Sequence, residues 1–85
     1  MPDDLRSPFK HHLVLHRIDP VQGIRRLYSL MIERDLFGTI RLLRHWGRIG
    51  SNGQELVGIC DSELEAGEAL EAVARAKRRR GYRDL

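Results

Sequence analysis

The sequence predicts an α+β fold, in which a small antiparallel sheet of about four strands carries one long C-terminal helix on a face. Two observations indicate this. Apolar residues alternate at two-residue spacing as far as Cys60 and recur at three- and four-residue spacing after it. The alternating stretches are separated by Gly, Pro, Asn and Asp, which favour turns. With 85 residues, the chain has the length of one domain.

The N-terminal region predicts a flexible arm followed by alternating strands. Residues 1–10 contain two prolines and two aspartates, and we expect a single domain over residues 11–85. Alternation places Tyr28, Leu30 and Ile32 on one face of the second strand. The expected strands are residues 11–18, 24–34, 39–49 and 54–60, joined by turns at 19–23, 35–38 and 51–53.

The segment after Cys60 predicts one helix over residues 62–80. Ser62 and Glu65 have the spacing of a capping box, with Ser62 as the N-cap and Glu65 bonding back to it. Acidic residues lie in the N-terminal half and basic residues in the C-terminal half, which complements the helix dipole. Gly81 fits the helix end. The side chains expected to face the sheet are Leu64 or Ala66, Leu70 and Val73.

The residue types predict neither catalysis nor a metal site. On a strand, His12 and His16 lie about 13 Å apart, too far to share one zinc ion. The glycines match no phosphate-binding loop, and no serine lies in a nucleophile elbow. Cys60, the only cysteine, precedes the helix N-terminus, which could lower its pKa, but we interpret it as a small, partly buried apolar residue. We therefore predict no catalytic residue, no metal ligand and no cofactor.

Charge and hydropathy predict a cytoplasmic protein that can approach nucleic acid. The N-terminus has no apolar run typical of a secretory signal, and no stretch is apolar enough to span a bilayer. The net charge is +3, and six basic residues with no acid lie between Arg75 and Arg83. These bases either bind phosphates or form a solvated helix end that complements the dipole.

The only tryptophan lies among arginines and glycines. If residues 39–49 form a strand, Arg44, Trp46 and Arg48 point the same way, with Trp46 and Arg48 about 7 Å apart. An aromatic ring beside guanidinium groups can stack on a sugar or base while pairing with a phosphate. Gly47 leaves room for another backbone to approach closely. Because Ile40 and Leu42 share the same face, Trp46 could instead anchor the core, and the residues alone leave both interpretations open.

Residues 46–50, Trp-Gly-Arg-Ile-Gly, followed by Ser-Asn-Gly-Gln at 51–54, resemble the signature of the WGR domain. Residues 16–20 and 77–82 are also similar to small bacterial WGR proteins, so the resemblance covers roughly residues 12–82. It implies a small antiparallel sheet with one helix. In DNA-dependent poly(ADP-ribose) polymerases this domain lies at a DNA end, with the motif Trp near the terminal sugar and the motif Arg close to the DNA and neighbouring domains. Those roles fall on Trp46 and Arg48.

The sequence thus predicts a non-enzymatic module that binds nucleic acid, with duplex DNA ends as the partner. The chain has no ADP-ribosyltransferase domain and no zinc finger, so it is not such a polymerase by itself. The alternative is a protein-interaction or self-associating module, which would pair a sheet edge or the Trp46 face with another subunit. The predicted binding residues are Trp46, Arg48, Arg44, Gln54, Lys77, Arg78, Arg79 and Arg80.

Overall fold

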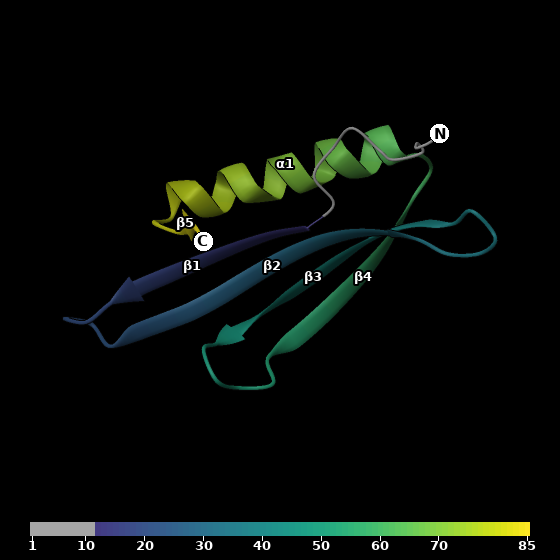
Figure 1. Cartoon of the computed structure of the whole chain (residues 1–85). Coiled ribbons are helices and arrows are strands. Elements are labelled where there is room, and N and C mark those ends of the chain that lie inside the picture. The colour runs from purple at the N-terminus through teal and green to yellow at the C-terminus, as the bar shows by residue number, and fades with distance from the viewer. Residues whose placement is uncertain (1–11) are drawn as a thin grey trace.

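The computed structural model describes residues 12–85 as one five-stranded antiparallel sheet with one helix (Figure 1). The strand order in the sheet is β4-β3-β2-β1-β5. The predicted α+β class is therefore confirmed. The expected N-terminal arm and His11 lie outside the described residues. The elements are β1 (His12–Asp19), β2 (Ile24–Arg34), β3 (Ile40–Arg48), β4 (Gln54–Cys60), α1 (Glu63–Arg79) and β5 (Arg83–Asp84).

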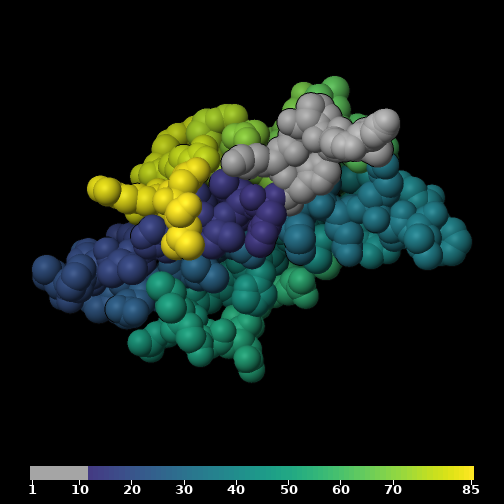
Figure 2. All heavy atoms as spheres, in the orientation of Figure 1, coloured from purple at the N-terminus to yellow at the C-terminus, as the bar shows by residue number. Residues whose placement is uncertain are grey.

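The four expected strands are present, and the structure adds a fifth. The bounds of β2 and β4 are those predicted, whereas β3 is one residue shorter at each end and β1 extends one residue further, to Asp19. The additional strand β5 pairs with Leu15 and His16 of β1. Figure 2 shows these C-terminal residues against β1. Two residues are too few to produce a hydrophobic pattern, so the sequence did not predict this strand.

The core lies between α1 and one face of the sheet. Tyr28, Leu30 and Ile32 are buried on β2, which confirms the expected face of that strand. From the helix, Ala66, Leu70 and Ala74 are buried, whereas Val73 is only partly so. The alternative placement of Leu64 in the core is wrong, because that side chain is 70% exposed. Residues two positions apart on a helix are separated by about 200° around its axis, so Leu64 points away from the sheet when Ala66 faces it.

A side chain caps the N-terminus of α1, and backbone hydrogen bonds cap its C-terminus. The Glu65 amide donates to Ser62 Oγ at 3.0 Å, as expected of the N-cap. The Glu65 carboxylate accepts from the amide of Asp61 instead of that of Ser62, so this half of the capping box closes one residue earlier than predicted. At the C-terminus, Gly81 has φ +97° and the Tyr82 amide donates to Lys77 O, a Schellman motif. This turn sends the chain back toward the sheet.

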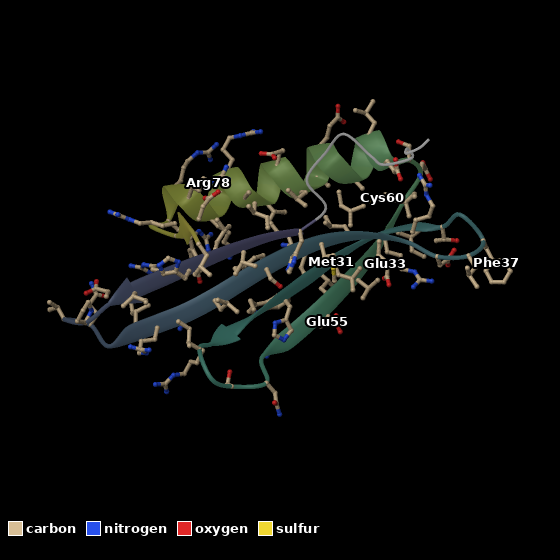
Figure 3. All side chains as sticks on the ribbon, viewed as in Figure 1. Met31, Glu33, Phe37, Glu55, Cys60 and Arg78 are labelled. Atoms are coloured by element: carbon tan, nitrogen blue, oxygen red, sulfur yellow. The ribbon has the colours of Figure 1, made fainter. Side chains whose placement is uncertain are left out.

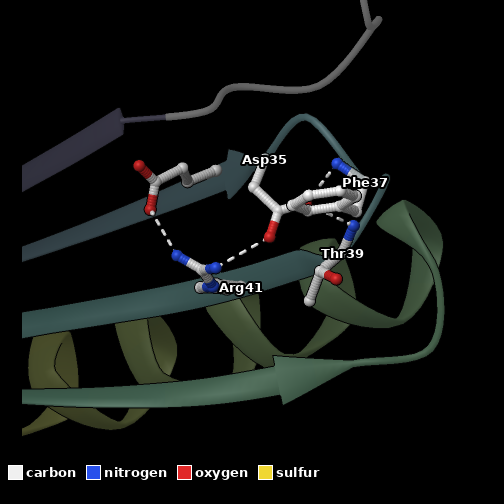
Figure 4. Close-up of polar contacts among 5 residues, drawn as sticks. Asp35, Phe37, Thr39 and Arg41 are labelled. Carbon is white, nitrogen blue, oxygen red and sulfur yellow. Dashed lines mark hydrogen bonds and ion pairs between the residues drawn. The ribbon is translucent and has the colours of Figure 1, made fainter.

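The tight connection between β2 and β3 is organised by Asp35. Its carboxylate accepts from the amides of Phe37 and Thr39 at 2.8 and 2.9 Å and from Arg41 at 2.7 Å (Figure 4). These hydrogen bonds, with Thr39 contributing most, hold the pKa of Asp35 below its ordinary value. The loop lies at the opposite end of the sheet from the C-terminal end of α1 (Figure 1).

Candidate nucleic-acid interface

Trp46 lies on the helix-facing side of β3, directly opposite Tyr28 of β2. The two rings are stacked, with centroids 5.7 Å apart and planes inclined by 14°. Tyr28 is buried, whereas Trp46 is only partly buried and packs on the margin of the core. One part of the indole therefore packs on the core and the rest remains accessible, so the structure leaves room for both interpretations of Trp46.

The end of the helix supplies two further groups beside this aromatic pair. The Schellman turn directs Tyr82 onto Tyr28, where the rings meet edge to face at 6.4 Å and 80°. The Lys77 ammonium lies 4.5 Å from the centroid of Tyr28 and 5.6 Å from that of Tyr82. Such cation–π contacts hold an ammonium group in a fixed position over the rings. The sheet and the helix terminus thus build one aromatic and cationic cluster.

These residues line an open groove with a volume of about 500 Å³. Four of the predicted binding residues lie together in it, namely Trp46, Arg48, Gln54 and Lys77. Sequence reasoning missed Arg26, Tyr28 and Tyr82, which also line the groove. The alternation of the second strand held a signal for Arg26, because it lies two residues before Tyr28 and so shares its face.

The groove is electropositive. Partial burial and the charges of Arg80, Arg44 and Arg26 lower the pKa of the Lys77 ammonium. No acidic side chain of residues 12–85 forms an ion pair with Arg26, Arg48 or Lys77. Cations gathered in a groove without counter-charges attract anions.

The other predicted residues lie outside the groove. Arg44 donates through Nε to Tyr28 Oη at 2.9 Å and, with Arg80, lines a neighbouring depression against α1. Arg78, labelled in Figure 3, pairs through two hydrogen bonds of 2.8 Å with Asp84 of β5. Because Arg78 donates these hydrogen bonds to the Asp84 carboxylate, its pKa is raised. Arg79 is exposed and lines neither hollow. The four basic residues 77–80 therefore do not share one hollow.

The loop between β3 and β4 lies close against the end of β3, where Gly47 and Gly53 leave no room for a Cβ atom. A Cβ atom on Gly47 would lie 2.7 Å from Gly53 Cα, so the backbone that Gly47 admits is that of its own loop. Asn52 O lies 2.8 Å from His45 Nε2, and Ser51 Oγ donates to Arg48 O at 2.7 Å. These contacts hold the backbone of the loop and of Arg48 at the end of its strand.

The remaining chemical groups add no second site. Burial, followed by the charges of Glu65 and Asp61, raises the pKa of the Cys60 thiol, which favours its interpretation as a partly buried apolar residue over that of an activated nucleophile. Residues 12–85 contain no group of three or more His, Cys, Asp or Glu side chains placed to hold a metal ion. In the same residues, the helix is too short and too polar to cross a membrane.

Comparison with known proteins gives a family and one relative. The model of the WGR domain matches residues 11–85. The protein y4dW of Sinorhizobium fredii, described as uncharacterized, is 42% identical over 80 residues, which make up 94% of this chain and 39% of that protein. The chain therefore spans well under half the length of this curated relative. No solved structure matches.

Proposed function

Because the chain belongs to the WGR domain family, we propose that residues 11–85 form a non-enzymatic nucleic-acid-binding domain that recognises DNA ends in the cytoplasm. One observation carries the proposal: a partly exposed indole lies in a groove whose cations have no acidic partners among residues 12–85. The ligand would contact Trp46 with a sugar or base, and Arg48 and Lys77 with phosphates.

The position of Trp46 favours a terminal nucleotide over an internal one. Within a duplex, neighbouring nucleotides cover both sides of each sugar and base, so a side chain rooted in a sheet has no access to their faces. At a terminus one side is open, and the exposed part of the indole can pack there. A terminal phosphate would then lie within reach of Arg48, whose planar guanidinium can pair with two oxygens at once.

A competition assay tests end recognition. We expect linear duplex to compete better than the same sequence closed into a circle. The variant Trp46→Ala should lose stacking of about 1–3 kcal/mol, whereas Trp46→Phe should keep most of it. Arg48→Lys should bind between wild type and Arg48→Ala, because lysine retains the charge without the planar fork. Equal affinity for linear and circular DNA would exclude end recognition, provided that circular dichroism shows each variant to be folded.

A second candidate function is self-association through the sheet edge. In the described part of the chain, β4 is an outer strand, and its side chains Leu56, Val57 and Ile59 are exposed. An outer strand without lysine or proline can pair with another strand. In this case the mass measured by light scattering would rise with protein concentration, and Val57→Lys would abolish the rise. A constant monomer mass would exclude it.

A further inference from the structure

Three arginines form a row across the sheet, and two of them, Arg26 and Arg48, line the groove. Arg17 of β1 lies directly opposite Arg26 of β2, which in turn lies opposite Arg48 of β3. All three side chains are on the helix-facing side, because each is two residues from the buried or partly buried row of Leu15, Tyr28 and Trp46. The row lies beyond the helix end, since a Cβ on Gly81 would be 3.3 Å from Arg17 Nε.

This arrangement is unfavourable for the isolated protein. Like charges directly opposite each other on neighbouring strands repel. Among residues 12–85, no carboxylate forms an ion pair with Arg17, Arg26 or Arg48. The Asp19 carboxylate, at the end of β1, accepts instead from the backbone amides of its own turn. The row therefore has the charge pattern of a surface completed by a bound polyanion.

The spacing of the row selects the kind of polyanion. Neighbouring strands are about 4.8 Å apart, so the row spans about 10 Å. Successive phosphates of one duplex strand rise by about 3.4 Å along the helix axis and lie farther apart than this along the strand, which winds around the axis. The long arginine side chains can spread outward from the row to reach three of them. An acidic peptide would not explain why the row begins at an aromatic groove, whereas a nucleic-acid strand offers a base or sugar followed by evenly repeated phosphates.

We propose that Arg48, Arg26 and Arg17 bind successive phosphates of one strand, which leaves the groove and crosses β3, β2 and β1 at right angles to the strands. Guanidinium groups suit this role, because their fixed fork pairs with two phosphate oxygens. The inference rests on the proposed function of the groove and extends the binding site to two strands outside the Trp-Gly-Arg motif.

The salt dependence of duplex binding tests the row. We would measure the dissociation constant between about 50 and 200 mM salt for Arg17→Gln, Arg26→Gln and Arg48→Gln. Each substitution should reduce the slope of log affinity against log salt by about 0.9. Arg75→Gln is the matched control, because this arginine is exposed on the helix and lines no part of the groove. Its slope should equal that of the wild type.

The order of the contacts is tested with duplexes in which one phosphate near the end is replaced by an uncharged methylphosphonate. In each variant, replacing the phosphate that the missing arginine would contact should cause no further loss of affinity, because that contact is already absent. We expect this insensitive phosphate to move along the DNA strand in the order Arg48→Gln, Arg26→Gln, Arg17→Gln. The triple variant should melt at or above the temperature of the wild type, because repulsion is relieved. A lower melting temperature would instead assign the arginines a structural role and overturn the inference.

The two proposals fail in different ways. If the wild type binds duplex and only Arg48→Gln changes the slope, the row is wrong and the groove remains the binding site. The row would also be wrong if the insensitive phosphates of the three variants did not follow this order along the DNA strand. If the wild type does not bind duplex even at the lowest salt, both proposals are wrong.

Discussion

Replacing Gly47 with alanine should destabilise the loop that joins β3 to β4. The added Cβ would lie 2.7 Å from Gly53 Cα and 3.2 Å from Ser51 Oγ. Carbon atoms in favourable contact are about 3.5–4.0 Å apart. The closer of the two neighbours is backbone, so no side-chain rotation can relieve the clash, and the loop must move away from the strand.

The structure allows an estimate of the cost. Overpacking of this kind costs about 1–3 kcal/mol. Displacement of the loop would also break the hydrogen bond between His45 and Asn52, worth about 0.5–1.5 kcal/mol. A total of roughly 1.5–4.5 kcal/mol follows. Because about 1 kcal/mol shifts the melting of a domain this small by 4–8 °C, the midpoint should fall by at least about 6 °C.

Thermal denaturation followed by circular dichroism measures this effect, with Gly58→Ala as the matched control. Gly58 lies on the neighbouring strand, and a Cβ there would meet no atom within 4 Å. Its replacement should leave stability unchanged or raise it by up to about 1 kcal/mol, since alanine restricts the unfolded chain. If Gly47→Ala melted together with Gly58→Ala and the wild type, the packing argument would be refuted.

Three further predictions concern the helix, the acid range and the basic run. Leu70→Ala should lower the free energy of unfolding by about 2–4 kcal/mol, because the Leu70 side chain is only 2% exposed. Leu64→Ala, at an exposed position, should change it by less than about 0.5 kcal/mol. Equal urea midpoints for the two variants would contradict the core described above. Because the loop amides lower the pKa of Asp35 in the folded state, its carboxylate contributes stability that is fully present above pH 3.8 and is lost as the pH falls below this value through the folded-state pKa. Asp35→Asn should therefore lose more stability at pH 7 than at pH 3 in urea titrations. An equal loss at both pH values would refute the linkage. Lys77→Gln should reduce the slope of log affinity for DNA against log salt by about 0.9. Arg78→Gln should leave this slope unchanged, because Arg78 is already paired with Asp84. A reduced slope for Arg78→Gln would show that the pair opens on binding.

The sheet and helix were predictable because the pattern has a single buried face. Alternation on β2 and β3 identified the helix-facing side, since a shift of one residue would expose every apolar side chain of that face. The capping residue Ser62 and the terminal Gly81 fixed the helix ends to within one residue. The strand β5 was missed because its two residues pair through the backbone and leave no trace in the hydropathy pattern.

The sequence predicted the groove residues that belong to the Trp-Gly-Arg motif and its loop, and Lys77 as a member of the basic run. Trp46 and Arg48 lie on one motif, and Gln54 follows across a short loop. Arg26 and Tyr28 reach the groove through the pairing register of β2 with β3, which hydropathy does not specify. Tyr82 depends on the backbone turn after the helix.

The sequence left open whether the basic residues 77–80 bind phosphates or form a solvated helix end, and helix geometry explains why they point in different directions. Successive residues of an α-helix are rotated by about 100° around the axis, so four in a row cannot face one ligand. Lys77 faces the groove, and Arg78 reaches Asp84 of β5 instead. A run of like charges on a helix therefore overstates the number of charges that meet at one place.

The single tryptophan gives the molecule an optical reporter inside its own candidate site. Trp46 is the only indole in the chain, stacks on the Tyr28 ring and lines the open groove. Unfolding would transfer it from this packed margin to water and shift its emission to longer wavelength, whereas a nucleobase stacked on its exposed part would quench the emission with little shift. Occupation of the groove and loss of the fold would therefore be separable in one spectrum, without any added dye.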